Sequence, residues 1–154
     1  MLRRSKVDDD ENGPRILVAN DDEAGCELVA RILEANGFSA VRSHAHNDAL
    51  LALNKASQPV RGVIIDFTSG ATSSNLKLLD SIRHGDEANR ECGVLVLAAS
   101  STNRLFAFQS GADAFMVRPF HANEMVAQLR DLLARSEDER ISYRNTQLRE
   151  AQSA

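Results

Sequence analysis

The sequence predicts an α/β domain, with a doubly wound, five-stranded parallel sheet flanked by five helices. Two observations lead to this prediction. Short apolar runs alternate with longer stretches in which apolar residues recur every three or four positions, as expected for strands that alternate with amphipathic helices. The runs at 16–19, 62–65 and 94–98 are apolar without interruption, which is typical of parallel strands covered by helices on both faces.

Each strand is expected where a short apolar run lies between polar or turn-forming residues. The five expected strands span 16–19, 39–42, 62–65, 94–98 and 114–117. The five expected helices have apolar faces at 28–33, 49–53, 76–82, 105–108 and 125–133. Because helices connect successive strands, right-handed crossovers place helices on both faces of the sheet.

Both ends of the chain are polar. Residues 1–14 contain a run of acids and end in Gly13-Pro14, which predicts a disordered segment before a folded domain at 15–134. Residues 135–154 contain only Ile141, Tyr143 and Leu148 as sizeable apolar groups, too few for a second domain. Three interpretations of this tail remain open: an extension of the fifth helix, a partner-binding segment, or disorder.

The composition excludes several classes of protein. The net charge of -4 argues against non-specific nucleic-acid binding. No apolar run reaches the length of a signal peptide core or of a membrane span, so we expect a cytoplasmic protein without a membrane partner. Cys26 and Cys92 lack metal or redox spacing and are expected to be reduced thiols. His44 and His46 are expected in a solvated loop rather than in a metal site.

Charged residues follow three of the expected strands, at the edge of the sheet where parallel α/β folds bind ligands. Asp21 follows the first strand, Asp66 ends the third, and Arg118 follows the fifth. Two carboxylates in one crevice suit Mg²⁺, and a carboxylate beside that cation can attack phosphorus while an arginine neutralises the phosphoryl group. Two alternatives remain open: Asp21 as a helix cap, and Asp66 in a structural ion pair with Arg118.

Four segments resemble one known family, the receiver domains of two-component response regulators. They are RILVANDDE at 15–23, GVIID at 62–66, VLVL at 94–97 and GADAFMVRPF at 111–120. The resemblance extends from residue 15 to about residue 134. It implies a flavodoxin-like fold with the strand order 2-1-3-4-5.

The resemblance also implies roles for individual residues. Asp66 matches the aspartate that accepts a phosphoryl group from a histidine kinase, and Asp21 matches the main acidic ligand of Mg²⁺. The main-chain carbonyl of Thr68 would be a further metal ligand, beside Asp66 itself. Phe115 matches the aromatic switch position, and Arg118-Pro119 stands at the family's Lys-Pro site, where the peptide bond is usually cis.

The sequence departs from the family pattern at this site. Asn20 stands in place of an acid, which leaves a weak or water-mediated metal ligand and lowers the expected affinity for Mg²⁺. Arg118 replaces a compact ammonium by a planar guanidinium. Ala98 stands at the switch position where the family has a hydroxyl, so Ser100 or Ser101 is the candidate source of that oxygen.

Two functions follow from these observations. The first is a stand-alone receiver, without turnover catalysis, that is phosphorylated by a sensor histidine kinase or a phosphotransfer protein. It would signal to an unidentified output protein through its fourth helix, fifth strand and fifth helix. The alternative is a phosphorylation-independent pseudo-receiver that binds a partner constitutively, which the residues at 20, 98 and 118 motivate. Both a monomer and a homodimer remain open.

Other functions fit less well. The acidic loop at 20–23 would repel the phosphate of a flavin cofactor. A phosphatase with an aspartate nucleophile usually has a second aspartate two residues later, where this chain has Thr68. The residues after the fifth helix are too few for a helix-turn-helix domain.

Overall fold

A computed structural model of the chain describes residues 13–54, 59–66, 72–85 and 91–153. Its five strands form one parallel sheet in the order β2-β1-β3-β4-β5, which confirms the predicted fold and strand order. The strands are β1 (Arg15–Ala19), β2 (Ser39–Ser43), β3 (Gly62–Asp66), β4 (Gly93–Ala98) and β5 (Ala114–Val117).

The five predicted helices are all present, but the predicted number was one too low for the described part of the chain. Five helices match the predictions and a sixth, α8, lies in the C-terminal tail; a short 3₁₀ turn, η1 (Ser101–Asn103), precedes α6. The helices are α2 (Glu23–Ala35), α3 (His46–Leu53), α4 (Thr72–Arg83), α6 (Arg104–Gln109), α7 (Ala122–Ala134) and α8 (Glu137–Ser153).

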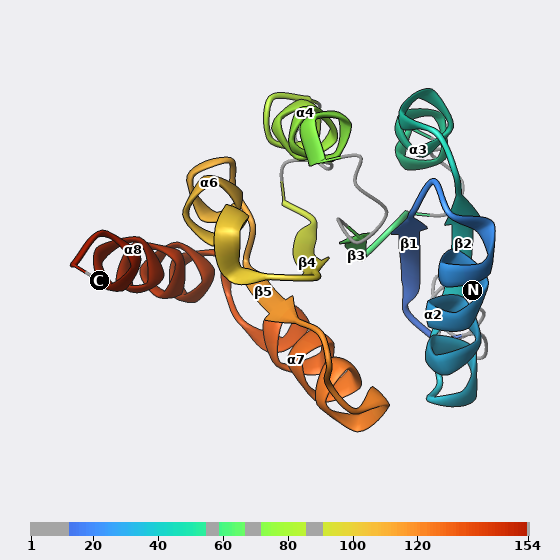
Figure 1. Cartoon of the computed structure of the whole chain (residues 1–154). Helices are drawn as coiled ribbons and strands as arrows, with labels where there is room; N and C mark the ends of the chain where they lie inside the picture. The colour runs from blue at the N-terminus through green and yellow to red at the C-terminus, as the bar shows by residue number, and fades with distance from the viewer. Residues whose placement is uncertain (1–12, 55–58, 67–71, 86–90, 154) are drawn as a thin grey trace, which may run out of the picture.

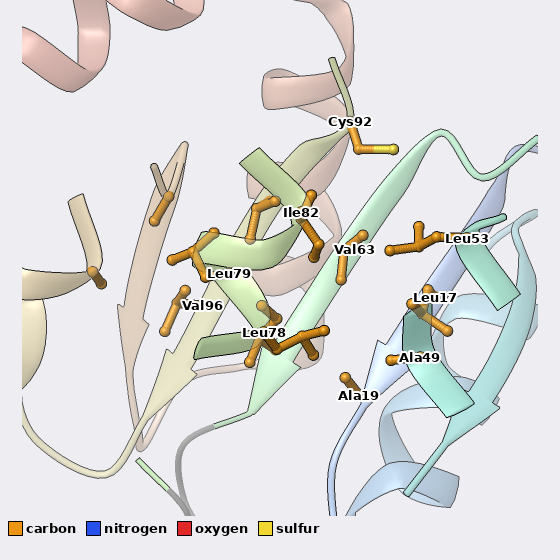
Figure 2. Close-up of a cluster of buried hydrophobic side chains, with 14 of the residues drawn as sticks. Leu17, Ala19, Ala49, Leu53, Val63, Leu78, Leu79, Ile82, Cys92 and Val96 are labelled. Carbon is orange, nitrogen blue, oxygen red and sulfur yellow. The ribbon is translucent and has the colours of Figure 1, made fainter. Parts of the chain in front are cut away.

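Helices lie on both faces of the sheet (Figure 1), and the sheet separates two hydrophobic clusters. Helices α3, α4 and α6 cover one face, where Leu17, Val63 and Val96 alternate with residues that point the other way (Figure 2). Helices α2 and α7 cover the opposite face, over Ile64 and Leu95 among others. The central strands β3 and β4 are buried throughout, which is why they are apolar without alternation in the sequence.

The register of the strands brings their carboxyl ends together. Ala19 of β1 pairs with Ile65 of β3, so the next residues along the two strands, Asn20 and Asp66, lie side by side. At the other side of Asp66, Ala98 ends β4, and its carbonyl oxygen accepts the backbone N–H of Arg118 at 2.9 Å. Residues far apart in the sequence therefore converge on one edge of the sheet.

Helix α8 is separate from α7. Helix α7 ends at Ala134, and Arg135 has an extended ψ of 143°. The hydroxyl of Ser136 then accepts the N–H of Glu139 at 3.1 Å, while the Glu139 carboxylate accepts the N–H of Ser136 at 2.9 Å. This reciprocal capping box starts a new helix, so the tail does not extend the fifth helix. In the described part of the chain, no helix has the length and apolar character needed to cross a membrane.

Candidate functional site

Asp66 lies at the base of the candidate site, at the end of β3. Its side chain is 1% exposed. Nη1 and Nη2 of Arg118 donate to its two carboxylate oxygens at 3.2 and 3.0 Å, which forms a bidentate ion pair. A buried carboxylate needs such a partner, because burial without one carries a large desolvation cost. The structure therefore contains the ion pair that the sequence left open as an alternative.

Asn20 supports Asp66 from the neighbouring strand. Its buried amide donates from Nδ2 to Oδ2 of Asp66 at 3.2 Å, and its Oδ1 accepts the backbone N–H of Asp22 at 3.0 Å. Nδ1 of His44 lies 3.1 Å from the Asn20 carbonyl oxygen. An acid at position 20 would repel Asp66, whereas the amide donates to it.

Asp22, rather than Asp21, caps the first helix. Its Oδ2 accepts the N–H of Gly25 at 3.0 Å, so the alternative role considered for Asp21 belongs to its neighbour. Asp21 is exposed and lines the same depression as Asp66. The two carboxylates are thus brought to one place, as the sequence predicted.

An open depression of about 570 Å³ lies above Asp66. Leu28 of α2 lies at its wall with 61% of its surface exposed. Leu28 was predicted on the buried face of its helix, and this prediction was wrong, because the buried face is centred on Cys26, Val29 and Leu33. The lining residues are Asn20, Asp21, Asp22, Gly25, Leu28, Asp66 and Arg118.

The donor groups in the depression fit a weakly held Mg²⁺ in part. Asp21 and Asp66 supply two carboxylates, and Mg²⁺ commonly takes one or two while it keeps several waters. Within the described ranges, no three His, Cys, Asp or Glu side chains form a group that could hold a metal ion. In its present orientation Asn20 directs an amide nitrogen at Asp66, and its oxygen already accepts from Asp22. The expected third ligand, Thr68, lies outside the described residues.

The candidate switch hydroxyls are directed elsewhere. Ala98 is buried and supplies only its backbone carbonyl to Arg118. The hydroxyl of Ser100 caps η1: it accepts the N–H of Thr102 at 3.4 Å and donates to the Thr102 hydroxyl at 3.0 Å. Ser101 lies with Arg104 and the end of α8 around a separate surface depression. In this conformation Ser100 and Ser101 therefore line no part of the depression above Asp66.

Phe115 lies at the middle of β5 and is half-buried. Its ring centroid is 6.5 Å from that of Phe108 in α6, and the Phe108 centroid is 6.5 Å from that of Tyr143 in α8. The predicted switch position is thus linked through one ring to the C-terminal helix. The peptide bond between Arg118 and Pro119 is cis, as the family resemblance implied.

A second cluster of charges was missed by the sequence analysis. Asp113, immediately before β5, is fully buried and faces Arg83, Arg140 and Arg144. These residues are scattered over the last half of the chain, so no local pattern indicated that they would meet. Ser136 and Glu139, which form the capping box of α8, have the spacing of a local helix-start signal.

Comparisons with known proteins agree with this geometry. No protein-family model matches the chain. It is 32% identical over 129 residues to the response regulator MprA of Mycobacterium avium, which covers 81% of this chain and 53% of MprA. It is 26% identical over 123 residues to the phosphate regulon transcriptional regulatory protein PhoB of Escherichia coli, which covers 79% of this chain and 52% of PhoB. The chain spans about half the length of these curated relatives.

Solved structures show the same fold. A putative response regulator from Chloroflexus aurantiacus superposes with a TM-score of 0.70 at 22% identity, over 80% of this chain and all of that chain. A CheY-like response regulator receiver domain protein from Methanospirillum hungatei gives a TM-score of 0.67 at 19% identity, over 84% of this chain and 97% of that chain. Nearly the whole of each solved domain thus corresponds to the sheet and helices described above.

Proposed function

Starting from a chain with the fold and the sequence pattern of a response-regulator receiver domain, we propose that Asp66 accepts a phosphoryl group. The observation that supports this most directly is the position of Asp66 at the base of an open depression. The guanidinium of Arg118 contacts both of its carboxylate oxygens there. The donor would be a sensor histidine kinase or a phosphotransfer protein in the cytoplasm. The domain would signal rather than turn over a substrate.

The chemistry requires one carboxylate oxygen of Asp66 to attack the phosphorus atom of the donor. A bond forms between this oxygen and phosphorus, and the bond from phosphorus to the leaving group breaks, with its electron pair going to the leaving group. The product is an acyl phosphate with more negative charge than the carboxylate. Arg118 can neutralise part of this added charge, because its planar guanidinium forms bidentate hydrogen bonds to phosphoryl oxygens as it does to a carboxylate.

We propose that Mg²⁺ is held by Asp21 and Asp66, with the main-chain carbonyl of Thr68 as a further ligand. The ion would neutralise phosphoryl oxygens that Arg118 does not reach. Binding of Mg²⁺ is expected to be weak, because Asn20 contributes no negative charge and Asp66 is already paired with Arg118. In this proposal Asn20 orients the Asp66 carboxylate.

The signal would reach a partner through α6, β5 and α7. Arg118 directly follows β5, and Phe115 of the same strand contacts Phe108 in α6. Movement of Arg118 toward a phosphoryl group would therefore act on the strand that carries the aromatic pair. The role of Phe115 as a switch depends on such movement, since Ala98 supplies no hydroxyl.

One observation favours the second candidate function, a pseudo-receiver that binds its partner constitutively. Asp66 already accepts hydrogen bonds from both Arg118 and Asn20, which is the arrangement expected of a structural ion pair. A site of this kind would keep one conformation and would not need phosphate.

Intact-protein mass spectrometry distinguishes the two functions. The wild type, Asp66→Asn and Asn20→Asp are incubated with Mg²⁺ and a small acyl phosphate. We expect one phosphoryl adduct on the wild type and none on Asp66→Asn. Asn20→Asp is expected to reach the same adduct yield at a lower Mg²⁺ concentration, since it restores a carboxylate to the metal site.

Each alternative result has a definite meaning. An adduct on Asp66→Asn equal to that on the wild type would place the acceptor elsewhere. No adduct on the wild type, together with an adduct on Asn20→Asp, would show that the native site has lost phosphoryl acceptance. The pseudo-receiver would then be the function to pursue.

A further inference from the structure

Helix α8 lies against α6 on the outer side of the domain (Figure 1). Tyr143 contacts Phe108 through its ring, and the side chain of Gln147 accepts a hydrogen bond from Arg104. Further along, Glu150 and Ala151 lie beside Ser101–Leu105 around one surface depression. The two helices therefore run antiparallel, and α8 covers a face of α6 from its C-terminal to its N-terminal end.

The apolar contact that holds α8 is small. Among the α8 residues whose burial the structure describes, Arg140 alone is buried. Only Tyr143 and Leu148 of α8 pack against the hydrophobic cluster, and both are half-buried. By contrast, α7 buries Met125, Val126, Leu129 and Leu132. Because hydrophobic burial supplies most of the energy that fixes a helix to a domain, α8 is held more weakly than α7.

Two arginines of α8 make charged contacts that centre on Asp113. The Asp113 side chain is fully buried, and its oxygens lie 3.1 Å from Nη2 of Arg144 and 3.6 Å from Nη1 of Arg140. Nε of Arg144 also donates to the Ala112 carbonyl at 3.3 Å. These contacts fix the N-terminal half of α8 to the segment that leads into β5.

Asp113 keeps its partners in the domain when α8 leaves. Oδ2 accepts from Nη2 of Arg83 in α4 at 2.7 Å and from the backbone N–H of Val94 at 2.8 Å. Nε and Nη1 of Arg83 donate to the carbonyls of Gly111 and Cys92. Detachment of α8 therefore leaves no isolated buried carboxylate, which is the usual reason why a buried ion pair is costly to open.

With α8 docked, three guanidinium groups share one buried carboxylate. Burial lowers the pKa of Arg83, and the like charges of Arg144 and Arg140 add to this effect, against the attraction of Asp113. Removal of α8 would relieve this repulsion. The charged contacts thus orient α8 without making its attachment irreversible.

We propose that α8 is a displaceable cover on α6, which opens while the rest of the domain stays folded. Docked, it occupies the face of α6 that carries Leu105 and Phe108, and any protein that binds this face must first displace it. The opening itself does not depend on phosphoryl transfer. Its regulatory meaning rests on the proposed function, in which α6 forms part of the signalling surface.

Hydrogen exchange of the full chain, followed by mass spectrometry without any phosphodonor, tests this proposal. In the wild type, we expect the amides of α8 to exchange at least about tenfold faster than those of α7 and β4, since sub-global opening exposes α8 alone. Arg144→Met removes the ion pair with Asp113, and Leu148→Ala removes an apolar contact. Each is expected to speed exchange in α8 by about a further tenfold, with α7 and the strands unchanged.

Arg149→Met is the matched control. Arg149 is exposed, and among the described residues its hydrogen bond is to Thr146 of its own helix, at 3.5 Å. The exchange pattern of Arg149→Met should therefore equal that of the wild type. Exchange of α8 as slow as that of α7 would overturn the proposal, as would variants that speed all segments equally. Protection of α6 that rises with protein concentration would also overturn it, because a second copy would then supply the cover. Failure of the mass adduct on Asp66 would leave these results intact.

Discussion

Arg118 and Asp66 meet across an intervening strand. Asp66 ends β3 and Arg118 follows β5, with β4 between them in the sheet, yet two hydrogen bonds of 3.2 and 3.0 Å join the side chains. The length of the arginine side chain allows this contact over the end of β4. The carboxylate is buried, whereas the arginine side chain is 32% exposed.

This unequal burial predicts how the pair contributes to stability. Arg118→Met should lower the free energy of unfolding by about 1 to 3 kcal/mol, because it removes the guanidinium counter-charge from a buried carboxylate, and the uncharged Asn20 amide does not replace that charge. The same substitution in an Asp66→Asn background should cost much less. Urea unfolding of the wild type, both single variants and the double variant measures the coupling energy, which we expect to be on the order of 1 kcal/mol or more. Additive effects would contradict this account of the pair.

Asp113 is expected to matter more for stability than any exposed acid. Asp113→Asn should reduce the free energy of unfolding by about 3 kcal/mol, because Arg83 stays buried without its counter-ion. Asp131→Asn serves as the matched control: the Asp131 side chain is 69% exposed and pairs with Arg135, the residue that follows α7, so the expected change is about 0 to 1 kcal/mol. Chemical denaturation at neutral pH compares the two. Equal changes in the free energy of unfolding would contradict the larger contribution expected of the buried Asp113.

Glu27 on α2 should make stability depend on acid pH. Hydrogen bonds from Arg42 and then Arg31 lower the pKa of Glu27 from 4.5 to about 2. The folded state thus favours the ionised form, so its contribution is present above pH 4.5 and is lost as the pH falls toward 2. The urea midpoint of the wild type should therefore fall more between pH 5 and pH 2 than that of Glu27→Gln. The Glu27 side chain is 42% exposed, so high salt should shrink the difference. Identical pH profiles would refute the assignment.

The elements of the sheet could be predicted because local pattern and tertiary environment agree. β3 and β4 are buried on both faces, and apart from Asp66 at the end of β3 their residues are apolar without a break. Helix α8 could not be predicted in this way, since it has few apolar residues and its contacts are made by arginines. Its capping box at Ser136 and Glu139 was a local signal of a helix start, but it carried no information about where the helix docks.

The candidate site shows the same division. Asp21, Asp66 and Arg118 could be placed at one edge of the sheet, because the carboxyl ends of parallel strands share that edge. Which groups contact one another depended on register and side-chain length. Asn20 turned out to donate to Asp66, Asp22 rather than Asp21 caps α2, and Ser100 caps η1.

The sequence by itself determined the alternation of strands and helices, the family resemblance and the edge of the sheet where the charged residues gather. These follow from hydrophobic periodicity and short motifs, which are local properties of the chain. Only the tertiary structure decided that Arg118 forms a bidentate ion pair with Asp66, that three arginines surround Asp113 and that α8 covers α6. Each of these contacts joins residues distant in the sequence, and their energies depend on burial, which exists only once the chain has folded.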